Sequence, residues 1–247
     1  METQCGQPCL ADMGRLPTSA PLALEPRSPH AIRLGIETGL VTIGILTLAR
    51  VLHVGPYSAM RWFLIPSLLV AAALVPSWIA RRPFARVGLD LANVKIALKA
   101  VGCVCLFAGP VAFLVQWVAT GLGLPIPLRP VIAGRGDCLS WLLYQFLYVA
   151  VAEEVFFRGY VQSNVMQLLV RRNWKSAITP RWIGIVISAS CFAVAHVIVQ
   201  GQVASLLTFF PGLLMAWLFV RTRSLLAPIL FHGLANVAYG VMALTLS

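Results

Sequence analysis

Acidic residues are scarce in this chain of 247 residues, which contains eight Asp and Glu against 19 Lys and Arg. Charged residues make up 11% of the sequence, whereas soluble domains carry about 25%. Hydrophobic residues make up 59%, and the mean hydropathy is +0.85. These values exclude a soluble domain of ordinary composition and predict an integral membrane protein.

The excess of basic residues does not indicate a nucleic-acid-binding face. The net charge of +11 comes from Lys and Arg spread over short segments between long apolar runs. In membrane proteins this distribution is a topology signal, because Lys and Arg favour cytoplasmic loops. We therefore expect membrane lipid around the chain and no nucleic-acid partner.

Cysteines are also few, and their positions argue against a disulfide framework. Cys5 and Cys9 lie near the N-terminus, and the other four lie in or beside apolar runs. Free Cys in such runs behaves as a small hydrophobic residue. We expect neither a disulfide nor a structural zinc site.

Seven apolar runs predict seven transmembrane helices, within a range of six to eight, because a span needs about 20 apolar residues. Residues 1–30 contain five prolines among small and polar residues, which predicts a flexible tail before one membrane domain over 31–247. The fold class is therefore all-α, a polytopic membrane helix bundle. The expected spans are 32–54, 62–80, 100–124, 138–170, 182–199, 203–220 and 225–246.

Three details of the spans follow from single residues. An amphipathic piece is expected over 87–99, before a third span that Pro110 should kink. The fourth span has two alternatives, a continuous helix to Val170 or a break at Gly159. Gln200-Gly201-Gln202 is the expected hinge between the fifth and sixth spans.

The last two acidic residues of the chain are adjacent, at Glu153 and Glu154, and Arg158 follows them in an apolar run. A charge at this depth costs roughly 2.5–3.5 kcal/mol on insertion scales, so such residues usually face the protein interior. Glu154 and Arg158 are four residues apart on a helix, which predicts an ion pair. Glu153 is rotated by about 100° and has no cation nearby in sequence, which leaves it free to act as a general base. An ion pair that only braces two helices explains Glu154 and Arg158 but not Glu153.

Two further motifs contain histidine: Phe192-x-x-x-His196 and His232-x-x-x-Asn236. The four-residue spacing places His232 and Asn236 on one face of a helix. A single His in an apolar helix is usually a hydrogen-bonded core residue. Two of them, with an Asn in register and a carboxylate pair, favour one polar site inside the C-terminal half of the bundle.

Motifs of the common hydrolases are missing. The chain has no Gly-x-Ser-x-Gly and no His-Glu-x-x-His, and no Asp after position 137 that could form a pair of membrane aspartates. The groups present can hydrolyse an amide without a covalent enzyme intermediate. Glu153 and His196 would activate water, and His232 and Asn236 would donate hydrogen bonds to the oxyanion.

In this order, the three motifs resemble those of the CPBP family of intramembrane glutamic proteases. This family includes the type II CAAX prenyl endopeptidases and related bacterial membrane proteases. The resemblance covers about residues 138–247, the motif-bearing core. Family members often have eight spans, one more than the number expected here.

The resemblance implies an endopeptidase that hydrolyses a peptide bond in a peptide or C-terminal tail of a membrane-associated protein. It leaves open whether that substrate is prenylated. It implies the catalytic residues Glu153, His196, His232 and Asn236, with Glu154 and Arg158 in support. The chain length and short tail favour a bacterial protein of the inner (cell) membrane.

Three alternatives remain beside a metal-independent protease without a cofactor. Glu153, His196 and His232 are a possible ligand set for catalytic zinc, although Arg158 beside a cation is unfavourable. The motifs can also serve as the structural network of a non-enzymatic binding or bacteriocin-immunity protein. Finally, intramembrane Glu and His can relay protons in a proton-coupled transporter.

Overall fold

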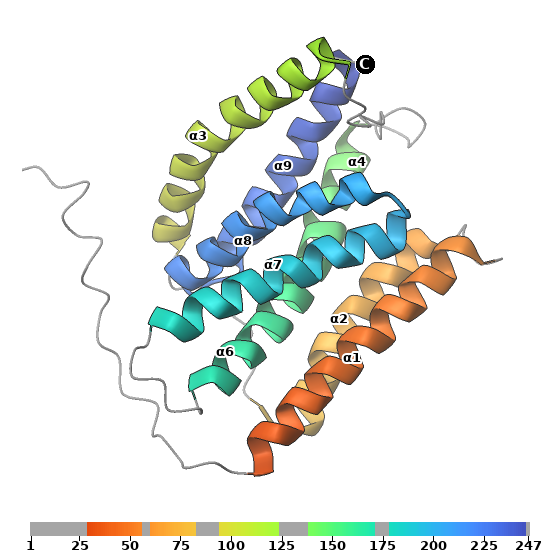
Figure 1. Cartoon of the computed structure of the whole chain (residues 1–247), viewed down its shortest axis with the longest axis vertical. Coiled ribbons are helices and arrows are strands. Elements are labelled where there is room, and N and C mark those ends of the chain that lie inside the picture. The colour runs from red at the N-terminus through yellow and green to blue at the C-terminus, as the bar shows by residue number, and fades with distance from the viewer. Residues whose placement is uncertain (1–28, 56–59, 83–93, 124–137, 171–177, 246–247) are drawn as a thin grey trace, which may run out of the picture.

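The computed structural model describes residues 29–55, 60–82, 94–123, 138–170 and 178–245. Within these ranges the chain forms helices and no strands, and seven helices are long and apolar enough to cross a membrane. This confirms the predicted all-α bundle of seven spans (Figure 1). The expected flexible tail lies almost wholly outside the described residues.

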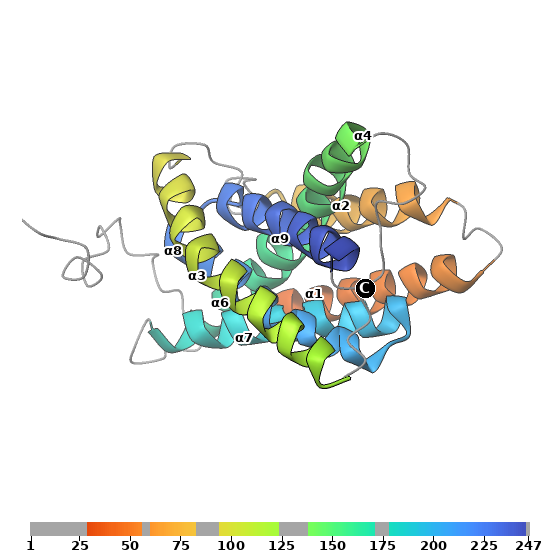
Figure 2. The same cartoon turned by 90° about the horizontal axis from the view of Figure 1, so that it is seen from above.

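The first three spans occupy two regions of the bundle. Helices α1 (Pro29–Val54) and α2 (Arg61–Ile79) pack against each other, whereas α3 (Val94–Gly121) packs on α9 (Leu226–Thr245) (Figures 1 and 2). Helix α3 begins at Val94 and continues through Pro110. Its first turns carry Lys95 and Lys99 of the expected amphipathic piece, whereas residues 87–93 lie outside the described part of the chain. Long Lys side chains can extend towards water from a helix end.

Residues 138–170 form one long helix whose pitch changes along its length. It consists of α4 (Cys138–Leu143), the π-helical η3 (Tyr144–Ala150), α5 (Val151–Glu154), the π-helical η4 (Val155–Gln162) and α6 (Ser163–Val170). Gly159 lies inside η4, so the helix does not break there. π-Helical turns are rare and often occur at functional sites. Here they flank the turn that carries the glutamate pair.

Side chains from neighbouring helices reach the backbone of η4. Ser188 of α7 (Ile178–Gln200) is fully buried, and its hydroxyl donates to the Phe157 carbonyl at 2.9 Å. Gln162 Nε2 donates to the Ala216 carbonyl of α8 (Phe209–Thr222) at 3.0 Å. These bonds fasten the long helix to α7 and α8 next to the glutamate pair.

The expected hinge between the fifth and sixth spans is confirmed. Helix α7 ends at Gln200, and the 3₁₀-helical η5 (Val203–Thr208) leads into α8. Gly201 has a φ of 70°, a left-handed conformation that glycine adopts without a steric penalty. Helices α7 and α8 therefore fold back against each other as an antiparallel pair (Figure 1).

A polar cluster joins α1 to the end of α2 and to the long helix. Both nitrogens at the end of the Arg82 guanidinium bond the Glu37 carboxylate, at 2.9 and 2.8 Å. The Tyr160 hydroxyl of η4 donates to the same carboxylate at 3.1 Å. The single acidic residue of the first span is thus neutralised by a cation from the end of α2 and tied to the long helix.

The N-terminal turn of α2 is bonded to the long helix at a carbonyl that precedes a proline. Pro66 lacks an N–H, so the Trp62 carbonyl has no donor four residues later in its own helix. The Tyr144 hydroxyl of η3 donates to this carbonyl at 2.8 Å. The carbonyl that Pro66 cannot bond thus forms a contact between α2 and the long helix.

We expect Ser188→Ala to lower the free energy of unfolding by about 1 kcal/mol, because it removes a buried donor from the η4 backbone. Thermal unfolding in detergent micelles measures the change. Ser190→Ala is the matched control, since Ser190 lies two residues along α7 and lines a groove on the outer face. Equal unfolding temperatures for the two variants would contradict this role of Ser188.

Candidate active site

The predicted ion pair between Glu154 and Arg158 is present and fully buried. Arg158 donates to Glu154 Oε1 at 2.9 Å and, through its other terminal nitrogen, to the Gly212 carbonyl of α8 at 3.1 Å. The guanidinium carbon lies 4.5 Å from the centre of the Phe192 ring. Since both charges are buried, removal of either one would leave an uncompensated charge in the bundle.

The same carboxylate oxygen also holds His232. His232 Nδ1 lies 2.8 Å from Glu154 Oε1, and the imidazole is buried. An ionised carboxylate only accepts hydrogen bonds, so Nδ1 carries the proton. The other ring nitrogen, Nε2, lies 3.8 Å from Glu153 Oε2.

His196 has a similar arrangement with a different anchor. Its Nδ1 lies 2.9 Å from the Phe192 carbonyl one turn earlier in α7. A carbonyl also only accepts, so Nδ1 of His196 carries a proton and Nε2 is available to the site. That Nε2 lies 4.0 Å from Glu153 Oε2.

Glu153 lies between the two imidazoles and has no cation of its own. Its Oε2 is buried and has no hydrogen-bond partner among the described residues. The distances of 3.8 and 4.0 Å to the two Nε2 atoms are too long for direct hydrogen bonds. The site therefore contains one neutralised carboxylate, Glu154, and one carboxylate that faces two nitrogens, Glu153.

Asn236 lies one turn along α9 from His232, as the spacing predicts, but its contact is with a residue that the motifs do not include. Asn236 Nδ2 donates to Gln145 Oε1 of η3 at 2.9 Å. The structure thus brings Glu153, His196 and His232 together and pairs Asn236 with Gln145 beside them. The only sequence signal for Gln145 is an amide side chain within an apolar run, eight residues before Glu153.

The possible zinc ligands Glu153, His196 and His232 lie near one another. The described residues nevertheless contain no group of three His, Cys, Asp or Glu side chains placed to hold a metal ion. The positive charge of Arg158, bonded to the adjacent Glu154, also lies within this cluster.

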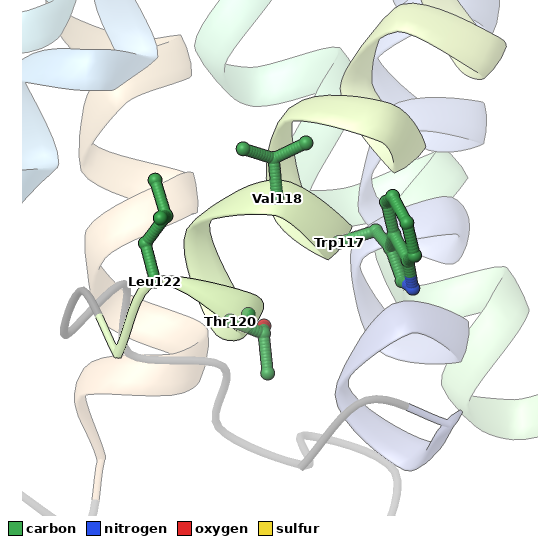
Figure 3. A pocket seen from close by; sticks show the side chains of 5 residues that line it. Trp117, Val118, Thr120 and Leu122 are labelled. Atoms are coloured by element: carbon green, nitrogen blue, oxygen red, sulfur yellow. The ribbon is translucent and has the colours of Figure 1, made fainter.

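A surface hollow elsewhere on the molecule has a different character. It has a volume of about 490 Å³ and lies at the C-terminal end of α3, where Trp117, Val118, Thr120, Gly121 and Leu122 line it (Figure 3). Its lining is mostly apolar and includes none of the motif residues. It is therefore no candidate for the catalytic centre.

Part of the chain matches a family model. Residues 135–238 match the family model described as type II CAAX prenyl endopeptidase Rce1-like, and this range contains all three motifs. Neither the curated proteins nor the solved structures include a match to the chain.

The approach of α9 to the long helix depends on Gly233, the residue after His232. A Cβ atom at this position would overlap the ring of Phe146, which neighbours Gln145. Glycine thus allows the backbone of α9 to lie against the Phe146 ring. This close approach brings His232 within reach of Glu154 and Asn236 within reach of Gln145.

We expect Gly233→Ala to destabilise the protein by about 1–3 kcal/mol, because the added methyl group overpacks this contact. Gly109→Ala in α3 is the control, since a Cβ there meets nothing within 4 Å. Thermal unfolding of the two variants in the same detergent gives the comparison. A Gly233→Ala protein as stable as the Gly109→Ala protein would show that the close approach is not required.

Proposed function

We propose that this chain is a glutamic intramembrane protease, on the premise that residues 135–238 match the type II CAAX prenyl endopeptidase Rce1-like family. Glu153 and His196 activate a water molecule, which attacks a peptide bond of a membrane-associated protein or peptide. His232 and Asn236 stabilise the oxyanion. The protein works in the membrane that its seven spans occupy, for which we propose the bacterial inner membrane.

The observation that carries this proposal is the contrast between the two adjacent glutamates. Glu154 Oε1 accepts from both Arg158 and His232, whereas Glu153 Oε2 has no hydrogen-bond partner among the described residues. Two atoms about 4 Å apart can both lie within hydrogen-bonding distance of a single water. A water between Glu153 Oε2 and His196 Nε2 can donate a proton to each, since both are acceptors when His196 is neutral.

The reaction follows from this position of the water. Its oxygen forms a bond to the scissile carbonyl carbon as one proton moves to the Glu153 carboxylate. The carbonyl oxygen becomes the oxyanion of a tetrahedral intermediate. The C–N bond then breaks, and Glu153 returns the proton to the leaving amine. No bond forms between enzyme and substrate.

His232 can donate to the oxyanion only when both of its ring nitrogens are protonated, because Nδ1 already donates to Glu154. Nε2 is the ring nitrogen that faces the other glutamate, 3.8 Å from Glu153 Oε2. The Asn236 amide provides a second donor one turn away on α9. Donors fixed before the reaction stabilise the developing charge without further reorganisation.

Two of the proposed catalytic residues are partly exposed although they lie among the helices. About 20% of the side-chain surface is exposed for both Glu153 and His196. By contrast, the side chains of Glu154 and Arg158 are fully buried. The exposed members are those that would contact water and substrate, and the buried members are those that would hold the site together.

Glu153→Gln and His196→Ala should each reduce cleavage by about 100-fold or more, because each removes an acceptor for the water's protons. The assay uses the purified protein and a peptide whose cleavage by the wild type is established by mass spectrometry. Gln116→Leu in α3 is the control and should keep its activity, because among the described residues the Gln116 amide bonds only Thr120 of its own helix. Unchanged cleavage by Glu153→Gln would refute the mechanism. Loss of activity with a chelator, reversed by zinc, would favour the metal alternative.

The adjacent glutamates should also differ in their effect on stability. Glu154→Gln leaves the buried Arg158 without its counter-ion, which costs about 3–5 kcal/mol. Glu153→Gln removes no hydrogen bond, so its unfolding temperature should equal or exceed that of the wild type. Thermal unfolding of the two purified variants measures this difference. An equal loss of stability in both would contradict the division of roles.

A further inference from the structure

Gln145 lies outside the three motifs but makes a hydrogen bond to a residue of the proposed oxyanion site. Its side chain is buried in η3, and Oε1 accepts from Asn236 Nδ2 at 2.9 Å. Among the described residues, this is the only side-chain hydrogen bond of Asn236. The orientation of the Asn236 amide therefore depends on Gln145.

The contact repeats a pattern seen at His232. The long helix and α9 meet at two polar contacts, His232 with Glu154 and Asn236 with Gln145. Gly233, which follows His232, closely approaches Phe146, which follows Gln145. On α9 the two polar residues are separated by one turn, about 6 Å. Each proposed oxyanion donor thus has its own partner on the long helix.

The partner matters because a primary amide has a donor end and an acceptor end. The terminal torsion of Asn is broad, so an unrestrained side chain can exchange Oδ1 and Nδ2 by rotation. Only Nδ2 can donate to an oxyanion. An acceptor at Gln145 Oε1 draws Nδ2 to its side and uses one of the two amide hydrogens. The second hydrogen then remains for the substrate.

We propose that Gln145 is a positioning residue that holds Asn236 in its donor orientation for the oxyanion. This role rests on the proposed function, since it acts through Asn236 and needs no contact between Gln145 and the reacting atoms. Gln145 lies outside the family motifs. It belongs to the π-helical η3, which packs against α9.

The test compares Gln145→Leu, which has no acceptor, with Gln145→Glu, which keeps an acceptor oxygen in either protonation state. Gln116→Leu in α3 is the matched control, because Gln116 is equally buried at 7% exposure and bonds only within its own helix. We expect Gln145→Leu to lower kcat about 10- to 100-fold with KM within about threefold, a loss typical of an oxyanion donor that is no longer fixed. Gln145→Glu and Gln116→Leu should retain most of kcat.

A double-mutant cycle with Asn236→Ala separates positioning from general structure. If Gln145 acts through Asn236, Gln145→Leu should have no further effect on kcat in the Asn236→Ala protein. Losses of kcat that multiply in the double variant would overturn the proposal, as would wild-type kcat in Gln145→Leu. If Gln145→Leu does not fold, kcat of Gln145→Glu decides. An activity near that of the wild type supports the proposal, and an activity as low as that of Asn236→Ala overturns it.

Failure of the proposed function would have a different signature. If Glu153→Gln cleaves the peptide as well as the wild type does, the oxyanion site itself is wrong, and both proposals fall. If Glu153→Gln is inactive but Gln145→Leu has wild-type kcat, only the role of Gln145 is refuted. Coupling in unfolding temperature without coupling in kcat would identify the contact as structural alone, and would also refute it.

Discussion

The buried carboxylate of Glu154 is the interaction on which the site depends. It is fully buried, and one oxygen accepts from Arg158 on its own helix and from His232 on α9. Arg158 in turn reaches the backbone of α8 at Gly212. Three transmembrane segments are therefore joined through one negative charge. Removal of any one of these partners would leave a buried charge less compensated.

This arrangement explains why two glutamates occur side by side. A carboxylate that accepts from two N–H donors is a weaker base, because those donors stabilise its negative charge. A carboxylate without partners would be costly to bury unless a neighbour compensated for it. The adjacent pair separates these demands. Glu154 holds the helices in register, and Glu153 remains available at the partly exposed edge of the site.

Helical spacing was sufficient to predict the ion pair, the shared face of His232 and Asn236, and the seven spans. Each of these follows from local periodicity and from the absence of charge. The contacts between helices could not be predicted in this way, because they depend on which faces meet. The π-helical turns of η3 and η4 shift the residues around the helix axis, so an α-helical projection misplaces Gln145. The bond from Tyr144 to the Trp62 carbonyl likewise joins segments far apart in sequence.

The segments outside the family match also contribute to the site through packing. Helix α1 is tied to the long helix by Glu37, which accepts from both Arg82 and Tyr160. Tyr160 lies in η4, two residues after Arg158, so the contact with Glu37 and the guanidinium that pairs with Glu154 share one π-helical segment. Segment η4 is packed between two groups of helices. Helices α1 and α2 contact it, and so do α7 and α8. The first two spans thus pack against the helix that carries the glutamate pair, although they lie outside the matched residues 135–238 and supply no motif residue.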